Sequence, residues 1–258
     1  MASTKLPNSH ETVDLSEYRA SRPEQARTED LLRILPRNKK SVLDIGARDG
    51  HFSRLLTAYF REVTALDLQL PSFEYPRVTT VAGDATNLAF SDNSFDVVFC
   101  AEVLEHIPPV EAACRELARV AKHAIVIGVP YKQDTRVGRT TCASCGKVNP
   151  PWGHVNTFDE SRLTTLFPGL TSSFSYVWET REATNPLSTL LHDLAGNPWG
   201  TYDQQEPCIH CGAKLVRPAA RPTWKRACSS LALRLNRAQA GYIRPHANWI
   251  HAVFLKER

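Results

Sequence analysis

Several signals that would place this chain in other classes of protein are missing from its 258 residues. No apolar run approaches the ~18 residues that a membrane-spanning helix requires, so we predict no transmembrane segment. Residues 1–15 are polar and lack the apolar centre of a secretion signal. We therefore expect residues 1–20 to form a disordered tail and the protein to be cytoplasmic.

Phosphate-binding glycine motifs are also missing. A dinucleotide fingerprint would need glycine at positions 46, 48 and 51, but Arg48 and His51 occupy two of these positions. No Gly-Lys-Ser or Gly-Lys-Thr triplet is present, which excludes the common nucleoside-triphosphate loop. The sequence therefore disfavours a cofactor that is held by its pyrophosphate.

Cysteine use argues against a secreted disulfide framework, because the seven cysteines are an odd number and four lie in two C-x-x-C-Gly pairs. These pairs are Cys142 with Cys145 and Cys208 with Cys211. Four thiolates at such turns form a closed tetrahedral zinc site, so we predict one structural Zn²⁺. Two unrelated pairs of thiols are the alternative. The other cysteines are expected to be small core residues: Cys100, Cys114 and Cys228.

The most informative segment that is present is residues 42–52, an apolar strand followed by a small-residue turn that opens a helix. A second apolar strand then ends on Asp67. The turn lets backbone approach a ligand, and an acid at the end of the second strand can accept hydrogen bonds from ribose hydroxyls. This unit predicts a site for the adenosine half of a cofactor.

The spacing Asp44-x-Gly46-x-x-x-Gly50 resembles the first motif of class I S-adenosylmethionine-dependent methyltransferases, with Arg48 where that family usually has glycine. Residues 102–107 read Glu-Val-Leu-Glu-His-Ile, a string that is typical of the methyltransferase-11/25-like branch of the family. The resemblance covers about residues 40–170 and the last strand. It implies S-adenosylmethionine as cofactor and methyl transfer as the activity.

The resemblance also implies where the cofactor binds. Asp67 would accept hydrogen bonds from the ribose, Asp44 would lie near the methionyl part, and the Gly-Asp-Ala string at residues 83–85 would flank the adenine. The complete predicted cofactor site is Asp44, Gly46, Ala47, Arg48, Gly50, Asp67, Leu68, Asp84, Ala85, Cys100, Ala101 and Glu102. Solvated carboxylates at the strand ends are the alternative for the three aspartates.

Strands separated by helices predict a doubly wound α/β fold. By resemblance the sheet is Rossmann-like and seven-stranded, with an antiparallel last strand and an inserted zinc-binding cap. We expect a methyltransferase core over residues 21–131, 155–181 and 246–258, and cap inserts over residues 132–154 and 182–245. Because both inserts would leave from the carboxyl edge of the sheet, their cysteine pairs can meet above the cleft.

Histidines supply the candidate proton acceptors. His106 follows the fourth strand at the ligand edge, and His154 lies in a Gly-His-x-x-x-Phe stretch that resembles the same branch of the family. A base is needed only where the acceptor must lose a proton, as a hydroxyl must. Glu102 and Tyr131 are weaker candidates in the cleft, and a purely structural role is the alternative for both histidines.

The prediction of the acceptor rests mainly on a motif that this sequence lacks. Residues 100–103 read Cys-Ala-Glu-Val where the amide and exocyclic-amine enzymes of the family carry Asn/Asp-Pro-Pro-aromatic. We therefore expect a small-molecule acceptor, or a carrier-linked glycan or metabolite, methylated at a hydroxyl. The alternatives are an RNA or protein methyltransferase that docks its substrate through the cap, and a non-catalytic adaptor that only binds S-adenosylmethionine.

Residues 207–245 contain no acid but eight basic side chains, and apolar residues recur within them at helical spacing. The pattern predicts an amphipathic helix with a basic outer face. Residues 214–244 would suit peripheral contact with an anionic membrane or docking of a phosphate-bearing partner. Nucleic acid is not favoured, since the net charge is only +4 and no recognition module is visible. The apolar positions are Trp224, Cys228, Leu231 and Leu235.

Overall fold

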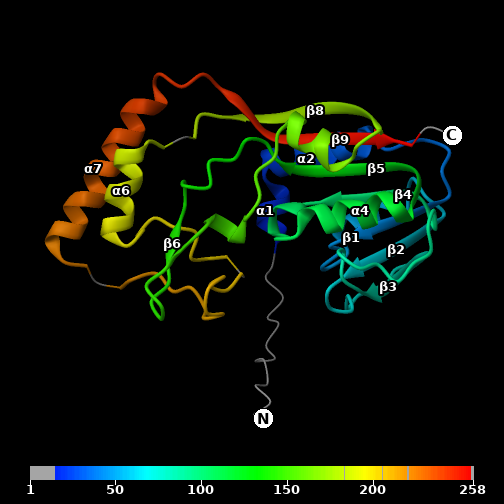
Figure 1. Cartoon of the computed structure of the whole chain (residues 1–258), viewed down its shortest axis with the longest axis horizontal. Helices are drawn as coiled ribbons and strands as arrows, with labels where there is room; N and C mark the ends of the chain where they lie inside the picture. The colour runs from blue at the N-terminus through cyan, green and yellow to red at the C-terminus, as the bar shows by residue number, and fades with distance from the viewer. Residues whose placement is uncertain (1–14, 183, 205, 220, 257–258) are drawn as a thin grey trace, which may run out of the picture.

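The computed structural model describes residues 15–182, 184–204, 206–219 and 221–256. A seven-stranded sheet lies at its centre. In chain order its strands are β1 (Ser41–Ile45), β2 (Glu62–Asp67), β3 (Val78–Ala82), β4 (Phe95–Ala101), β5 (Ala121–Pro130), β8 (Thr171–Thr180) and β9 (His246–Leu255). Their order across the sheet is β3-β2-β1-β4-β5-β9-β8 (Figure 1).

The directions of the strands place the ends of β5 and β8, where the two predicted inserts begin, at one edge of the sheet. Strands β1 to β5 are parallel, whereas β9 is antiparallel to both β5 and β8. Strand β8 therefore runs in the same direction as β5, and both end at the same edge of the sheet. The doubly wound, Rossmann-like, seven-stranded sheet and its antiparallel last strand, as predicted from the sequence, are confirmed.

Helices cover both faces of this sheet. In chain order, the helices of the described residues are α1 (Ser16–Ala20), α2 (Arg22–Arg33), α3 (His51–Leu56), the 3₁₀ turn η1 (Leu104–His106), α4 (Val110–Val120), the 3₁₀ turn η2 (Pro151–Gly153), α5 (Glu160–Leu166), α6 (Pro186–Ala195) and α7 (Thr223–Ala240). Apolar residues of α2 and α3 join one buried cluster with the sheet, and those of α4 and α5 join a second cluster on the other face.

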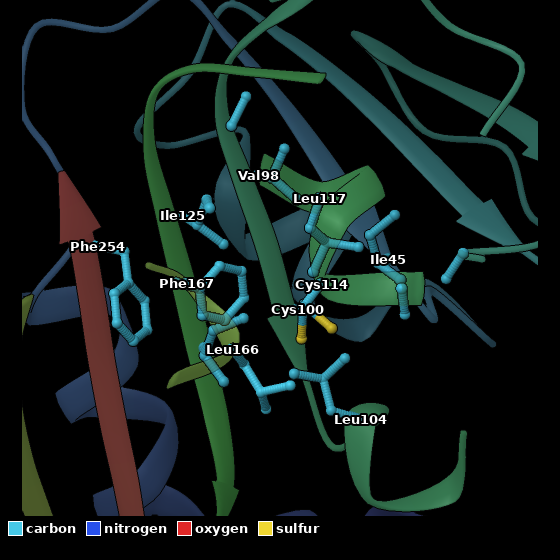
Figure 2. Close-up of a cluster of buried hydrophobic side chains, with 14 of the residues drawn as sticks. Ile45, Val98, Cys100, Leu104, Cys114, Leu117, Ile125, Leu166, Phe167 and Phe254 are labelled. Atoms are coloured by element: carbon cyan, nitrogen blue, oxygen red, sulfur yellow. The ribbon is translucent and has the colours of Figure 1, made fainter. Parts of the chain in front are cut away.

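The alternation of side chains along β4 explains how one strand serves both clusters. Val98 and Cys100 belong to the layer under α4, together with Leu117 (Figure 2). Val97 and Phe99 belong to the opposite layer. All four side chains on β4 are fully buried, as expected for a central parallel strand covered on both faces.

Two expectations about local structure are wrong. The tail expected over residues 1–20 ends in helix α1, and residues 1–14 lie outside the described part of the chain. Cys228 is only half-buried, whereas Cys100 and Cys114 are core residues as expected.

Both inserts form structure of their own. The first contains a two-stranded sheet, β6 (Thr140–Thr141) with β7 (Val148–Asn149), and the second contains α6 and α7. Figure 1 shows α6 and α7 side by side at one end of the molecule, away from the helices that cover the sheet. The division of the chain into a core and a cap stays a prediction. Among the described residues, none of the helices has the length and apolarity to cross a membrane.

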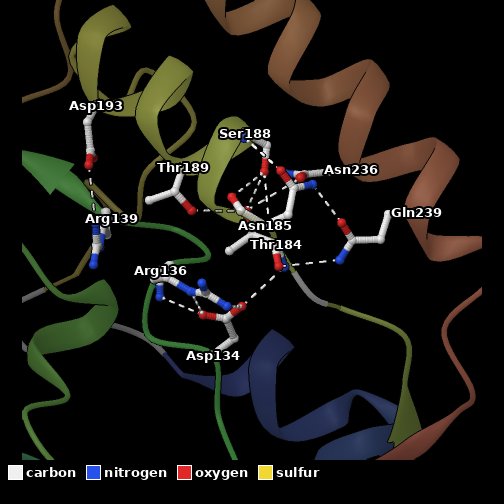
Figure 3. Close-up of polar contacts among 10 residues, drawn as sticks. All are labelled: Asp134, Arg136, Arg139, Thr184, Asn185, Ser188, Thr189, Asp193, Asn236 and Gln239. Carbon is white, nitrogen blue, oxygen red and sulfur yellow. Dashed lines mark hydrogen bonds and ion pairs between the residues drawn. The ribbon is translucent and has the colours of Figure 1, made fainter.

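Polar side chains join α6 to α7. Asn185 donates from Nδ2 to Oε1 of Gln239 at 2.6 Å, and Gln239 donates from Nε2 to the carbonyl oxygen of Thr184 at 3.3 Å (Figure 3). Helix α7 lies within the residues 207–245 for which an amphipathic helix was predicted, but of its predicted apolar positions Trp224 and Leu231 are exposed, and Cys228 and Leu235 are only half-buried. The following side chains are 48–55% exposed: Leu187, Leu190, Leu194, Trp224 and Leu231.

Candidate active site

A cavity of about 620 Å³ lies at the carboxyl edge of the sheet. Gly46 after β1, Glu102 after β4 and Tyr131 after β5 line one side of it. Its other walls include Trp152 from the first insert and Glu206 from the second. Open α/β sheets bind ligands at this edge, because the loops that leave the parallel strands converge there.

The turn between β1 and α3 is built from backbone that glycine favours. Gly46 has φ +76°, and a β-carbon on it would lie 2.2 Å from Cγ2 of Val103. Arg48 occupies the position where the family usually has glycine and adopts the same left-handed region, with φ +47°. Its backbone amide donates to Oδ2 of Asp67 at 2.9 Å, so the end of β2 is tied to the turn.

Asp44 lies beneath this turn and is 2% exposed. Burial raises its pKa to about 7, against the opposing effect of a hydrogen bond from Oγ of Ser53 at 2.5 Å. A buried carboxyl group with one donor is poorly compensated. It therefore favours a cationic group nearby when the site is filled.

The structure places part of the predicted cofactor site on the cavity wall and part outside it. On the wall are Asp44, Gly46, Ala47, Arg48, Ala101 and Glu102. Outside the wall are Gly50, Asp67, Leu68, Asp84, Ala85 and Cys100. Asp84 is engaged in its own turn, where its Oδ1 accepts from the backbone and hydroxyl of Thr86, both at 2.8 Å. The side chain of Phe73 lies against Gly50.

Two residues near the N-terminus were missed by the sequence analysis. Tyr18 donates to Oε1 of Glu102 at 3.1 Å, and Arg27 donates to Oε2 of the same carboxylate at 2.8 Å. Arg27 is 1% exposed, and its guanidinium lies 4.7 Å from the ring centre of Trp249. The sequence signal for this arrangement is a pair of opposite charges, Glu24 and Arg27, at helical spacing with Leu31 on one face of α2.

Both predicted histidines reach the cavity and lie together. The ring centres of His106 and His154 are 4.7 Å apart and nearly perpendicular. Burial lowers the pKa of both, and it lowers that of His154 to about 3. Glu105, which the sequence analysis did not single out, joins them on the wall and is 1% exposed. Burial raises its pKa to about 8.

The four paired cysteines converge. Their sulfur atoms all lie within 4.8 Å of one another, and Sγ of Cys142 is 3.7 Å from Sγ of Cys211, as Sγ of Cys145 is from Sγ of Cys208. A tetrahedral site with Zn–S bonds of about 2.3 Å has sulfur atoms roughly 3.8 Å apart. The arrangement therefore fits a tetrahedral metal site and is far too long for disulfides.

The two cysteine turns repeat one backbone design. The amide of Gly146 donates to the carbonyl oxygen of Cys142 at 2.9 Å, and the amide of Gly212 donates to that of Cys208 at 2.8 Å. Both glycines are left-handed, with φ +71° and +70°. Backbone hydrogen bonds lower the pKa of Cys142, which favours the thiolate that binds metal.

Contacts between the two inserts connect the cysteine cluster to the cavity wall. The amide of Thr201 donates to the carbonyl oxygen of Gly138 at 3.0 Å. A β-carbon on Gly200 would lie 2.1 Å from the carbonyl oxygen of Arg139. Any residue other than glycine at position 200 would therefore clash with the first insert. The second insert then runs through Glu206, on the cavity wall, to Cys208.

Comparisons with known proteins agree with the family that the sequence motifs resemble. Residues 43–126 match the family described as a methyltransferase domain. A demethylmenaquinone methyltransferase of Roseiflexus is 36% identical over 90 residues, which are 31% of this chain and 38% of that protein. A probable S-adenosylmethionine-dependent methyltransferase of Mycobacterium tuberculosis is 28% identical over 142 residues, 52% of this chain and 49% of that one.

Residues 43–126 thus form a methyltransferase domain. The fold agrees, since the crystal structure of the YcgJ protein of Bacillus subtilis matches with a TM-score of 0.54 over 91% of this chain and 99% of that one, at 17% identity. The chain spans less than half the length of the two curated relatives. The matched segment of the methyltransferase domain ends before the first cysteine pair, so the inserts lie outside it.

Proposed function

We propose that this chain transfers the methyl group of S-adenosylmethionine to a hydroxyl of a small-molecule acceptor or of a carrier-linked glycan or metabolite. The observation that carries the proposal is a single cavity lined by both the turn after β1 and the pair His106 and His154. A methyltransferase domain needs the cofactor and the acceptor in one enclosed space, because methyl transfer requires them in line and in contact.

The cofactor would be held by the motif residues. The buried carboxyl group of Asp44 lies under the turn that would carry the methionyl part, where the cofactor is cationic. Asp67 would accept hydrogen bonds from the ribose, with one of its oxygens already fixed by the amide of Arg48. The sulfonium supplies a methyl group that is already activated. The role of the chain is therefore alignment rather than activation of the leaving group.

The size and contents of the cavity support a small acceptor that carries a hydroxyl. Its volume of about 620 Å³ lies within the roughly 300–1,000 Å³ of small-molecule sites. Nitrogen and oxygen atoms of His106, His154 and Glu206 on its wall are available to hydrogen-bond a hydroxyl and to take part in moving its proton.

Calorimetry followed by turnover tests this function. We expect S-adenosylmethionine to bind the full chain and a hydroxyl-bearing acceptor to release S-adenosylhomocysteine. The acceptor panel should contain phenols, glycans and carrier-linked thioesters beside amines and RNA. Turnover on amines or RNA alone would overturn the hydroxyl assignment. Binding without turnover on any acceptor class would instead favour the adaptor.

We further propose that Cys142, Cys145, Cys208 and Cys211 bind one structural Zn²⁺. Four thiolates leave no open position on the ion, so such a site contributes to folding and not to the reaction. Metal analysis of the purified chain should find one zinc that survives dialysis. A purified chain without zinc whose inserts keep their structure would contradict the proposal.

The exposed apolar faces of α6 and α7 support a second candidate, in which the acceptor is part of a macromolecule. Arg226, Arg234 and Arg237 lie on α7 beside the exposed Trp224 and Leu231. Retention on an anionic partner should then fall with salt. Neutralising the three arginines should abolish that retention while turnover on a small acceptor stays unchanged.

A further inference from the structure

We propose that Glu105, His106 and His154 bind one divalent transition-metal ion inside the cavity, at a site separate from the four cysteines. The ion itself is inferred from the geometry of these three side chains. Its role in the reaction rests on the proposed function. The two claims therefore need separate measurements, and each can fail without the other.

The three side chains already have the spacing of a metal site. One potential ligand atom from each lies within 4.8 Å of the other two, and all three residues line the same cavity. Two imidazoles and one carboxylate form a common ligand set for zinc, iron and similar divalent ions.

Glu105 supplies an independent reason to expect a ligand. The residue is 1% exposed, and neither oxygen of its carboxylate has a hydrogen-bond partner. A buried carboxylate without partners is costly, and such groups are normally paired or coordinate a metal. Nearby Glu102 is different, because Tyr18 and Arg27 occupy its two oxygens. An ion bound between Glu105 and the histidines would supply the missing partner.

His154 is oriented as metal-ligating histidines usually are. Nδ1 of His154 lies 2.7 Å from Oε1 of Gln133, an oxygen that can only accept. The ring therefore donates from Nδ1 and keeps its lone pair on Nε2. Ligand histidines commonly fix their second nitrogen by such a bond. Gln133 is thus a positioning residue for this site.

The backbone locks the two ligand-bearing segments together. The amides of Val155 and Asn156 both donate to the carbonyl oxygen of Glu105, at 2.8 and 3.2 Å. The side chain of Asn156 also donates to the carbonyl oxygens of Leu104 and Ile107, at 2.9 and 2.7 Å. The position of His154 relative to η1 is therefore fixed by four hydrogen bonds before any ion arrives.

Three protein ligands leave coordination positions free for oxygen atoms of the acceptor. Coordination lowers the pKa of a hydroxyl, so its proton leaves to solvent or to the carboxylate of Glu206 on the same wall. The oxygen then forms a bond to the methyl carbon as the bond from carbon to sulfur breaks. The sulfur departs as a neutral thioether. Metal coordination replaces the proton-acceptor role expected of the two histidines.

Titration with Mn²⁺ of the full chain carrying a single Zn²⁺, held by the four cysteines, tests the site through the loss of the free-ion electron paramagnetic resonance signal. Mn²⁺ prefers nitrogen and oxygen ligands, so it leaves the thiolates alone. We expect one Mn²⁺ per chain. Glu105→Gln and His154→Gln should abolish this binding, and Gln133→Leu should weaken it by about 10–100-fold.

His192→Ala is the matched control, because His192 is a half-buried histidine on α6 outside the cavity wall. Its Mn²⁺ affinity should equal that of the unchanged chain. Glu105→Gln must still bind S-adenosylmethionine, which shows that it is folded. No Mn²⁺ binding to the unchanged chain, or equal binding in all variants, would overturn the site. Metal binding without turnover would count only against the proposed function.

Discussion

The sheet and the inserts are stabilised in different ways. The sheet is packed on both faces by two large clusters of buried apolar side chains. The buried cluster of the inserts contains Cys142, Tyr202, Cys208 and Leu215, so two of its four members are proposed metal ligands. Apolar burial of that size stabilises little structure, and small units of this kind commonly depend on metal.

The sheet and the inserts, which are stabilised differently, bound one cavity together. The turn after β1 belongs to the sheet and rests on packing. Trp152, His154 and Glu206 belong to the inserts. We infer that the cofactor half of the site persists when the inserts open, whereas the acceptor half does not.

Removal of zinc should have the largest effect on the difference between the sheet and the inserts. Binding of structural zinc is worth about 10–16 kcal/mol in zinc-dependent peptides, and Cys208→Ser removes one of the four thiolates. Hydrogen exchange should become fast over residues 138–154 and 196–217 and stay slow in β1, β4 and β5. Acceptor turnover should be lost while cofactor affinity falls little. Exchange that rises equally in the sheet would show that the two regions are not independent.

A core truncation should reverse the pattern with a smaller effect. Leu117 is fully buried under β4, and Leu117→Ala should lower the free energy of unfolding by about 2–5 kcal/mol. The zinc content should not change. Leu231→Ala is the control, because this leucine on α7 is 48% exposed and its loss should cost within about 0.5 kcal/mol. Denaturant unfolding followed with metal analysis separates the two results.

Local patterns predicted the sheet well because each strand carries its own signal. Strands β1 and β2 each contain one of the apolar runs, although polar residues stand at Ser41, Glu62 and Asp67 at their ends. Asp159 caps α5 by accepting from the amide of Arg162. Arg27 is different, because besides its local pair with Glu24 it reaches Glu102. Local patterns do not predict this contact between distant parts of the chain.

The site was predictable only in part, for a related reason. Motifs located Asp44, Gly46, His106 and the cysteines, since each belongs to a recurring string. The unpaired carboxylate of Glu105 depends on which residues surround it, and spacing along the chain does not show that. The apolar stripe of α7 indicated a helix but not its orientation. Its buried side is held by polar contacts to α6.

Within the sheet half, Asp67→Ala should weaken S-adenosylmethionine binding by roughly 1–3 kcal/mol, the scale of hydrogen bonds to a charged group. Zinc content and the thermal stability of the inserts should not change. Glu62→Ala is the matched control, because Glu62 is an exposed acid at the opposite end of β2 and is off the cavity wall. Equal calorimetric affinity of Asp67→Ala and the unchanged chain would remove Asp67 from the ribose role.

The smallest expected effect concerns the pairing of α2 with β9. Burial raises the pKa of Asp30. Hydrogen bonds from His251, Ser175 and Arg33 outweigh this effect and hold the pKa well below its ordinary value. A depressed pKa contributes stability above the unfolded pKa of about 3.9, and that stability is lost as pH falls. Asp30→Asn should therefore cost on the order of 1 kcal/mol at pH 7, since the group is partly solvated. The difference from the unchanged chain should shrink below about pH 4. A difference that does not vary with pH would assign the contact to hydrogen bonding alone.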